Sequence, residues 1–433
     1  MESTTTLSSH LRRLPLFAPI LNGLRGCLKT ALTYWRNYQS FLTNCLNRTT
    51  RHENQAFGED YEKLEQTRQR HADLWNGRVG SMISHMMELA GYSESSRILH
   101  RSFFSDKVAF SLGPYPTETA QGGTWKSFMA DDHTPLELSW SWSGRNSKPV
   151  VRYAAEPIGW LAGSSTDPLN MKAGLKCLED SRLWAPSMDL QWYHHFSHTL
   201  LTMSETVATD CVPANADSPS QAFIAFDLEE ETMVVKYYFI PTSKAALLGR
   251  SNLDLAVESI LSLPKLGQGF AKPLGVVMDH ISSFSATSRP HVLIIAVDCI
   301  EPQLSRVKIY VRYQQTSFDS MIQALRLGGA LPPFSATVLK DLEELWCGCF
   351  GVHDTSTPLD NVVHRTAGLL YYYELKANKA LPTSKVYLPV RHYASDDDQV
   401  ARGLSDFLSK RGMTLSGGSS YYDGLSQLWY VLR

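Results

Sequence analysis

The sequence lacks an excess of charge of either sign, a regular cysteine spacing and a long apolar run. Its 433 residues hold 41 Lys and Arg against 43 Asp and Glu, so no surface for nucleic acid or an anionic membrane is expected. The seven cysteines are scattered, which favours reduced thiols over disulfides or a metal site. The apolar stretch 14–28 is interrupted by proline, glycine and arginine and is too short to span a bilayer. We expect a cytoplasmic protein without nucleic-acid or membrane partners.

The sequence is rich in aromatic residues, at 11% with 19 Tyr, and in alternating segments. Residues 60–92 have apolar positions at helical spacing, and Gly91 is expected to end this helical region. Four predicted β-hairpins follow: 135–142 with 150–158, 222–228 with 233–241, 291–299 with 306–313, and 368–375 with 385–393.

Each predicted hairpin is followed by a helical stretch, and the unit recurs every ~70–85 residues. Repeated antiparallel hairpins can close into a barrel, which removes exposed strand edges. Helices outside it would cover the apolar strand faces, so the polar faces would line a central chamber. We therefore predict an α+β fold, an antiparallel β-barrel surrounded by α-helices. Residues 1–55 would form an N-terminal helical extension and residues 56–433 a single barrel domain.

The inward-facing positions repeat a basic pattern. They include Arg152, Lys236, Arg306, Lys308 and Lys385. Cations that converge without matching acids repel one another and lose hydration unless an anion arrives. A diphosphate is such an anion, since it accepts hydrogen bonds from Arg and Lys on all sides. A solvated outer face would explain one such strand, but cation-x-Tyr recurs on three.

The tyrosines of that repeat are Tyr238, Tyr310 and Tyr387. If a diphosphate leaves a carbocation behind, electron-rich rings stabilise it by about 0.5–2 kcal/mol each and keep water away. Any single one of these residues is also explained as an ordinary strand aromatic.

Glu137 is the carboxylate expected to point inward from the first predicted strand. It could accept a hydrogen bond from an N–H or O–H of an aromatic acceptor and so raise the nucleophilicity of the ring, while the site holds the ring in attack geometry. The alternative is an ion pair with Arg152 across the hairpin.

Several of these segments together resemble the fungal indole prenyltransferases of the dimethylallyltryptophan synthase family. They are "MMELAGY" (86–92), "FFSDKVAFSLGPYP" (103–116), "PLELSWSW" (135–142), "VVRYAAEP" (150–157), "KYYFIP" (236–241), "RVKIYVRY" (306–313) and "KVYLPVRHY" (385–393). The resemblance covers roughly residues 60–410. It implies an ABBA barrel of ten antiparallel strands ringed by helices. It also implies metal-independent transfer of a dimethylallyl group from dimethylallyl diphosphate to an indole.

The resemblance also implies roles for the residues above. Glu137 is similar to the glutamate that binds the indole N–H. Arg152, Lys236, Arg306 and Lys308 resemble the diphosphate ligands, and Lys385 occupies a neighbouring polar position that varies among members. Tyr238, Tyr310 and Tyr387 resemble the tyrosine shield over the allyl group.

Three features depart from the family pattern. Gln221, Ala222 and Phe223 stand where some members carry a lysine that is thought to take the ring proton. Ile240 stands where members acting on free tryptophan tend to have tyrosine, which favours a cyclic dipeptide or another elaborated indole. The C-terminal segment 413–433 is shorter than the family's closing segment, which supplies further chamber residues. Tyr421 and Tyr422 are the candidates there, but neither is assigned a role.

No metal or other cofactor is expected beside dimethylallyl diphosphate. Enzymes that bind a diphosphate through magnesium use paired DDxxD motifs, and residues 131–135 and 396–400 both fail at the last position. We predict a dimethylallyl transferase that acts on a tryptophan-containing cyclic dipeptide or related indole. The alternatives are the same fold acting on free tryptophan or on a phenol, xanthone or tyrosine, and then a non-catalytic ligand-binding barrel. Whether the chain forms a homodimer stays open.

Overall fold

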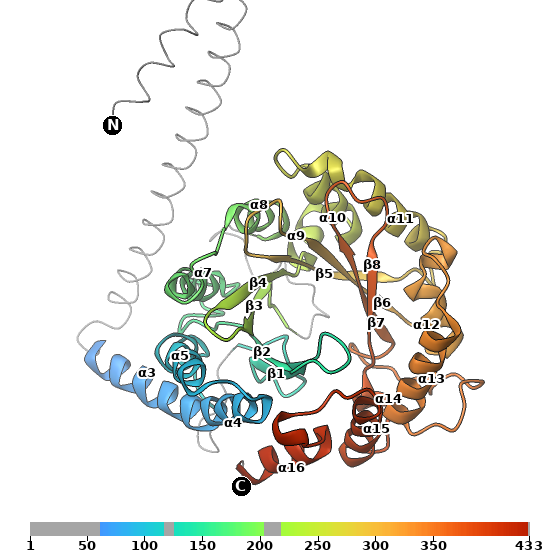
Figure 1. Cartoon of the computed structure of the whole chain (residues 1–433). Helices are drawn as coiled ribbons and strands as arrows, with labels where there is room; N and C mark the ends of the chain where they lie inside the picture. The colour runs from blue at the N-terminus through green and yellow to red at the C-terminus, as the bar shows by residue number, and fades with distance from the viewer. Residues whose placement is uncertain (1–60, 117–124, 203–217, 432–433) are drawn as a thin grey trace, which may run out of the picture. The chain divides into compact units, whose positions relative to one another are not determined.

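The centre of the protein is one antiparallel sheet of eight strands in chain order, which curls into a half-barrel (Figure 1). The computed structural model describes residues 61–116, 125–202 and 218–431. The strands are β1 (Leu136–Ser141), β2 (Val150–Ala155), β3 (Ala222–Leu228), β4 (Met233–Phe239), β5 (His291–Asp298), β6 (Val307–Tyr313), β7 (Leu369–Leu375) and β8 (Thr383–Tyr387). All four predicted hairpins are confirmed, as β1–β2, β3–β4, β5–β6 and β7–β8.

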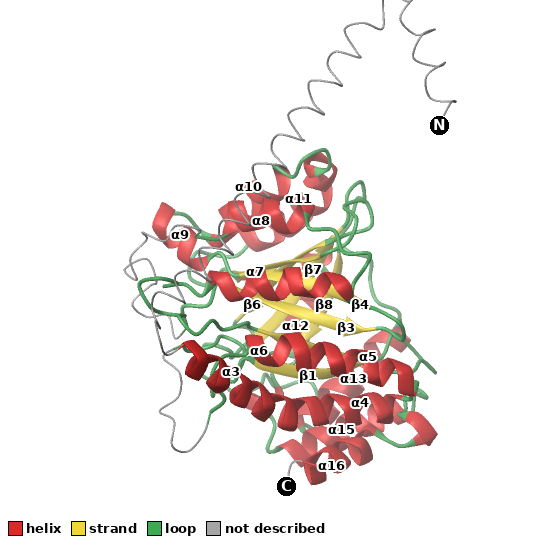
Figure 2. Cartoon of the chain, turned by 90° about the vertical axis from the view of Figure 1, so that its left-hand side faces the viewer, coloured by secondary structure: helices red, strands yellow, loops and turns green. Residues whose placement is uncertain are grey.

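Helices lie around the outer side of this sheet, with α7 and α12 on opposite sides in Figure 1, and α7 lies in front of the sheet in Figure 2. The helices are α3 (Tyr61–Trp75), α4 (Ser81–Ala90), α5 (Glu94–Phe103), α6 (Ala109–Ser111), α7 (Met171–Asp180), α8 (Gln191–Leu200), α9 (Thr242–Leu248), α10 (Asn252–Leu261), α11 (Ala271–Ser282), α12 (Phe318–Leu325), α13 (Ala336–Phe350), α14 (Val390–Tyr393), α15 (Asp397–Ser409) and α16 (Tyr421–Val431). No described helix combines the length and apolar character needed to cross a bilayer.

Local sequence explains where several helices begin and end. Ser251, Ser317 and Asp396 each accept a hydrogen bond from a main-chain N–H in the first turn of the following helix. Such side chains satisfy donors that the helix itself leaves without a partner. Gly91 ends α4 in the left-handed conformation, at φ 79°, as the sequence predicts.

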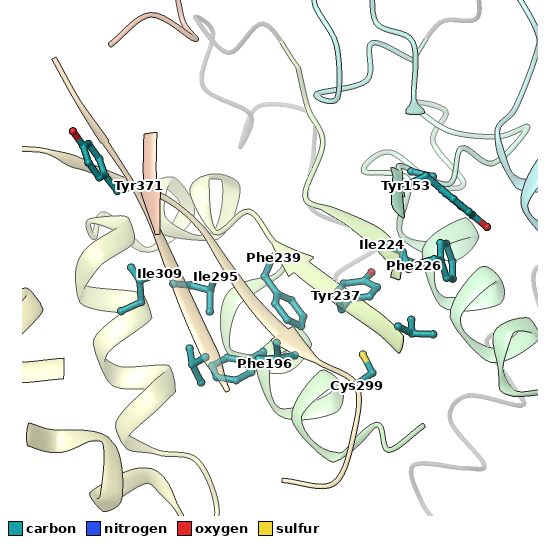
Figure 3. Close-up of a cluster of buried hydrophobic side chains, with 14 of the residues drawn as sticks. Tyr153, Phe196, Ile224, Phe226, Tyr237, Phe239, Ile295, Cys299, Ile309 and Tyr371 are labelled. Atoms are coloured by element: carbon teal, nitrogen blue, oxygen red, sulfur yellow. The ribbon is translucent and has the colours of Figure 1, made fainter. Parts of the chain in front are cut away.

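The alternation within each strand separates two apolar clusters. Outward-facing side chains such as Tyr237, Phe239 and Ile295 are buried against the helices (Figure 3). The ring of Phe196 on α8 lies 5.7 Å from that of Phe239. A second, smaller cluster lies on the inner face and includes Phe223, Ile240, Ile294, Ala296 and Tyr310. The inner face is thus partly apolar, and its polar groups are concentrated elsewhere along the strands.

The described residues contain eight strands rather than the ten expected, and no pairing joins the edge strands β1 and β8 to each other. The last predicted strand, 385–393, is also too long, because β8 stops at Tyr387 and α14 begins at Val390. Pro389 between them has no N–H for a strand ladder. The rest of the chain up to residue 431 adds helices α15 and α16 instead of further strands.

Residues Lys63–Arg433 form one compact unit. The helical extension expected over residues 1–55 lies outside the described residues, and the domain boundary at residue 56 stays a prediction.

Candidate active site

Five basic side chains gather at the end of the sheet where the hairpin turns lie. They are Arg152 on β2, Lys236 on β4, Arg306 just before β6, Lys308 on β6 and Lys385 on β8. Lys236 and Lys308 are only 6% and 5% exposed. The charges of Arg152 and Lys236 act on Lys385, and those of Lys236 and Arg306 act on Lys308. The structure therefore brings all five predicted cations together, and we call them the basic layer.

Three carboxylates are interleaved with the basic layer, contrary to the expectation of cations without matching acids. Asp227 pairs with Lys236 and lies 3.2 Å from Nε of Arg152. Asp298 is 2.6 Å from Nε of Arg306 and 3.2 Å from Nζ of Lys308.

The third carboxylate is Glu374, which lies 3.0 Å from Nη1 of Arg306. Asp227, Asp298 and Glu374 each occupy an inward position near the end of the first strand of a hairpin. The alternation that located the cations therefore also contained the signal for these acids.

Burial and repulsion by neighbouring cations lower the pKa values of Lys308 and Lys385. Burial lowers the pKa of Lys308 to about 8, although the adjacent Asp298 carboxylate acts in the opposite direction. The pKa of Lys385 is also lowered, by burial first and then by Arg152 and Lys236. Burial would raise the pKa of Asp298, but the neighbouring cations outweigh it and lower that pKa. Five basic groups against three carboxylates leave an excess of two positive charges, which an incoming anion can neutralise.

The three predicted tyrosines form a continuous aromatic surface next to the basic layer. The ring centroids of Tyr238 and Tyr310 are 5.9 Å apart, and those of Tyr310 and Tyr387 are 6.0 Å apart. The hydroxyl oxygens of Tyr310 and Tyr387 are 3.5 Å apart. Burial raises the pKa of all three phenols, so they stay neutral and electron-rich at physiological pH.

A fourth tyrosine, Tyr372, belongs to this surface and was not predicted. Its ring centroid lies 5.3 Å from that of Tyr310 and 6.2 Å from that of Tyr387. The Nζ atoms of Lys308 and Lys385 lie 5.7 and 5.8 Å from its ring. Alternation along "LLYYYEL" places Tyr372 on the inner face, between the outward-facing Tyr371 and Tyr373, so the sequence contained this signal too.

Glu137 lies on β1, opposite Ala154. Its side chain is solvent-accessible, yet burial by the surrounding protein raises the pKa of its carboxyl group. Both statements hold for a group on a concave wall that water can enter. Its charge contributes to the raised pKa of Tyr387, which is caused mainly by burial.

The predicted alternative for Glu137 is not observed. Ser139, not Glu137, lies opposite Arg152, and within the described residues no ion pair joins Glu137 to Arg152. The guanidinium of Arg152 pairs with Asp227 instead. Glu137 is therefore an inward-facing carboxylate near the tyrosine surface.

The two acidic segments tested for metal binding have structural roles. Asp396 caps α15, Asp398 pairs with Arg402 at 2.6 Å, and Asp132 accepts a hydrogen bond from the N–H of Thr134. Within the part of the chain that the structure describes, no group of three or more His, Cys, Asp and Glu side chains could hold a metal ion.

Comparison with known families agrees with this architecture. A family model described as tryptophan dimethylallyltransferase matches residues 71–423. The chain belongs to this family. The 4-O-dimethylallyl-L-tyrosine synthase of Claviceps purpurea is 50% identical over 362 residues, which cover 83% of this chain and 81% of the relative. A 7-dimethylallyltryptophan synthase of Aspergillus fumigatus is 31% identical over 353 residues, 78% of this chain and 74% of the relative. The protein is thus an aromatic prenyltransferase.

Solved prenyltransferase structures share the fold. AnaPT from Neosartorya fischeri superimposes with a TM-score of 0.69 at 25% identity, over 83% of this chain and 84% of AnaPT. NotF in complex with brevianamide F and DMSPP gives a TM-score of 0.70 at 24% identity, over 83% of this chain and 86% of NotF. At 24% identity, the likeness to NotF supports the fold alone.

Two residues that depart from the family pattern, Gln221 and Ile240, have identified contacts in this prenyltransferase. The side-chain oxygen of Gln221 accepts a hydrogen bond from the N–H of Thr202, and its amide nitrogen donates to the Thr202 carbonyl. Gln221 is therefore a fixed amide with no titratable group. Ile240 belongs to the inner apolar cluster.

The C-terminal tyrosines do not line the inner face. The ring centroid of Tyr421 lies 6.0 Å from that of Trp140, and Trp140 belongs to the outer apolar cluster. The hydroxyl of Tyr422 donates to Asp398, 2.8 Å away. Neither candidate contributes to the chamber, because Tyr421 packs on the outer side of β1 and Tyr422 bonds to α15.

Proposed function

We propose that this prenyltransferase transfers the dimethylallyl group of dimethylallyl diphosphate to the phenol oxygen of L-tyrosine. The observation that supports tyrosine as the acceptor is the 50% identity, over about four-fifths of both chains, with a relative named 4-O-dimethylallyl-L-tyrosine synthase. The steps below rest on the arrangement of the inner wall.

The first step is cleavage of the bond between the dimethylallyl C1 and the diphosphate oxygen. The basic layer binds the diphosphate and stabilises the pyrophosphate, which leaves with the electron pair. Lys308 and Lys236 are buried and point to the same side of the sheet as Tyr310 and Tyr238. The cation that is left behind is therefore held beside the tyrosine rings, which stabilise it and exclude water.

The second step forms the bond between C1 and the acceptor oxygen. A lone pair of the phenol oxygen attacks C1, and the phenol proton passes to Glu137. The raised pKa of Glu137 suits a group that must accept a proton and later release it to water. Transfer to oxygen leaves no proton to remove from a ring carbon, which agrees with Gln221, Ala222 and Phe223 in the stretch where some members carry a lysine.

Indoles are the second candidate acceptors, as the sequence predicts. A relative at 31% identity is named 7-dimethylallyltryptophan synthase, and a carboxylate accepts a hydrogen bond from an indole N–H as well as from a phenol O–H. Free tryptophan and a tryptophan-containing cyclic dipeptide are therefore tested beside tyrosine.

The test is incubation of the purified protein with dimethylallyl diphosphate and each acceptor, in the presence of EDTA. Mass spectrometry measures addition of one dimethylallyl group, and NMR identifies the substituted atom. We expect the highest kcat/KM for L-tyrosine, an O-substituted product and no effect of EDTA. A higher kcat/KM for an indole would overturn the tyrosine assignment, and loss of turnover in EDTA would overturn the metal-independent mechanism.

A further inference from the structure

A second group of basic side chains lies at the opposite end of the sheet from the basic layer. Arg312 is on β6 and shares its inward face with Lys308 and Tyr310. Arg365 precedes β7, and Arg391 is on α14. We call Arg312, Arg365 and Arg391 the arginine cluster.

Two members of the cluster, Arg365 and Arg391, pair with the carboxylate of Asp131. Nη2 of Arg365 lies 3.4 Å from Oδ1 of Asp131, and Nη1 of Arg391 lies 2.8 Å from Oδ2. Arg312 donates through Nη1 to the carbonyl oxygens of Thr366 and Ala367 at 2.7 and 3.1 Å. Its buried Nε has no hydrogen-bond partner among the described residues. A buried donor without a partner is costly, so an acceptor supplied by a ligand would bind favourably to it.

The cluster is connected to the tyrosine surface by stacked rings. The guanidinium of Arg365 lies 5.9 Å from the centroid of Phe128. The ring of Phe128 stacks on Phe223 at 6.2 Å, and Phe223 stacks on Tyr238 at 4.3 Å. The cluster therefore borders the apolar end of the inner face.

The segment that carries Phe128 and Asp131 is held rigidly. The buried carboxylate of Glu156 accepts hydrogen bonds from Nε1 of Trp125 at 2.9 Å, from Oγ of Ser127 at 2.6 Å and from the N–H of Phe128 at 3.2 Å. A recognition group on this segment is fixed in place before any ligand arrives, which lowers the cost of ordering it on binding.

Two cations of the arginine cluster, Arg312 and Arg365, repel each other. Burial lowers the pKa of Arg312 to about 10, and the charge of Arg365 acts in the same direction. A carboxylate beside these two groups would relieve the repulsion and could accept paired hydrogen bonds from a guanidinium.

We propose that Arg312 and Arg365 bind the α-carboxylate of a free amino-acid acceptor, while Asp131 accepts its ammonium group. This rests on the proposed function. Tyr310 and Arg312 are two residues apart on one strand, about 7 Å, which matches the extent of a tyrosine from its phenol oxygen to its α-carbon. The acceptor would thus lie along β6, with its phenol near Glu137 and its charged end at the cluster. Recognition by this cluster requires no tyrosine at the position of Ile240.

The experiment compares L-tyrosine with tyramine, which lacks the carboxylate, in the wild type and in Arg365→Gln. We expect the wild type to prefer L-tyrosine. Arg365→Gln should lower kcat/KM for L-tyrosine by roughly 10- to 150-fold, mainly through KM, and change that for tyramine by less than about threefold. Arg365→Lys should restore part of the preference. Arg402→Gln is the control, because Arg402 pairs with Asp398 and its side chain is 61% exposed, and it should change neither value by more than about threefold.

A second variant tests the ammonium contact. The comparison acceptor is 3-(4-hydroxyphenyl)propionate, which lacks the amino group. In Asp131→Asn the ratio of kcat/KM for L-tyrosine to kcat/KM for this acceptor should be smaller than in the wild type. Thermal unfolding of every variant identifies loss of fold. Equal losses for L-tyrosine and tyramine in folded Arg365→Gln would overturn the inference and leave the proposed function intact. Failure of the wild type to use tyrosine would overturn the proposed function, and the cluster would then be tested with L-tryptophan against tryptamine.

Discussion

Among the inner-wall carboxylates, Glu137 differs from Asp227, Asp298 and Glu374 in its surroundings. Those three are paired with cations of the basic layer, so their negative charge is already engaged. Glu137 lies instead beside the phenol of Tyr387. A carboxylate in this position is available to an incoming O–H or N–H group.

Glu137→Gln should therefore abolish proton acceptance while preserving shape. We expect kcat to fall by about 10²–10⁴-fold, the range for loss of a general base, with little change in the midpoint of thermal unfolding. Asp398→Asn, which changes an exposed carboxylate paired with Arg402, is the control for charge removal. Turnover of Glu137→Gln within threefold of wild type would remove Glu137 from the mechanism.

Lys308 leads to a prediction about pH. Its pKa is lowered to about 8, so the free enzyme loses this charge as the pH rises through 8, and it binds the diphosphate less well. The value of kcat/KM for dimethylallyl diphosphate should fall above about pH 8 by up to tenfold per unit. Lys308→Arg should lose this alkaline limb, because arginine stays charged throughout. An identical limb in that variant would assign the titration to another group.

The cations and tyrosines were predictable because strand alternation fixes which residues share a face. Asp227, Asp298, Glu374 and Tyr372 obey the same rule on the first strands of their hairpins, so they were equally predictable. The group at Arg312, Arg365 and Asp131 was not predictable in this way. Its members come from a strand and from two connections far apart in the sequence, which only tertiary packing brings together.

At the scale of elements, α13 and α15 approach closely through two glycines. A Cβ atom at Gly403 would overlap the carbonyl oxygen of Gly348. Gly348 lies between Cys347 and Cys349 and faces the main chain of Gly403 on the neighbouring helix. This contact explains the glycine between the two cysteines.

Gly403→Ala should therefore destabilise the protein, although alanine is the better helix former by about 1 kcal/mol. Overpacking of this kind typically costs about 1–3 kcal/mol, measurable by urea unfolding. Gly275→Ala in α11 is the control, because a Cβ there meets nothing within 4 Å, and it should be neutral or slightly stabilising. A stability of Gly403→Ala equal to or above that of the wild type would contradict the close contact.

At the scale of the whole molecule, the basic layer joins residues from all four hairpins. Arg152, Lys236, Lys308 and Lys385 lie on β2, β4, β6 and β8, and Arg306 lies just before β6. An anion bound there contacts elements that span most of the chain, and it favours the folded state over the unfolded one.

Pyrophosphate should therefore raise the thermal unfolding midpoint. At a concentration 100 times its Kd the stabilisation is about 2.7 kcal/mol, and it should weaken as sodium chloride is added. Arg306→Met together with Lys308→Met should remove most of the effect, whereas Lys410→Met, at an exposed pair with Glu344, should retain it. If pyrophosphate stabilised the double variant of Arg306 and Lys308 as much as the wild type, the anion would bind outside the basic layer.

The sequence by itself determined the hairpins, the inward or outward direction of each strand residue and the family, because these follow from local periodicity and from ordered motifs. It did not determine the number of strands, since the segment after Pro389 continues as helices, and it did not reveal the pairing of cations with acids. Tertiary structure decided the pairing because the register of neighbouring strands sets each acid beside its cations. Position along the strands sets the basic layer and the arginine cluster at opposite ends of the inner face, since Lys308 and Arg312 lie towards opposite ends of β6.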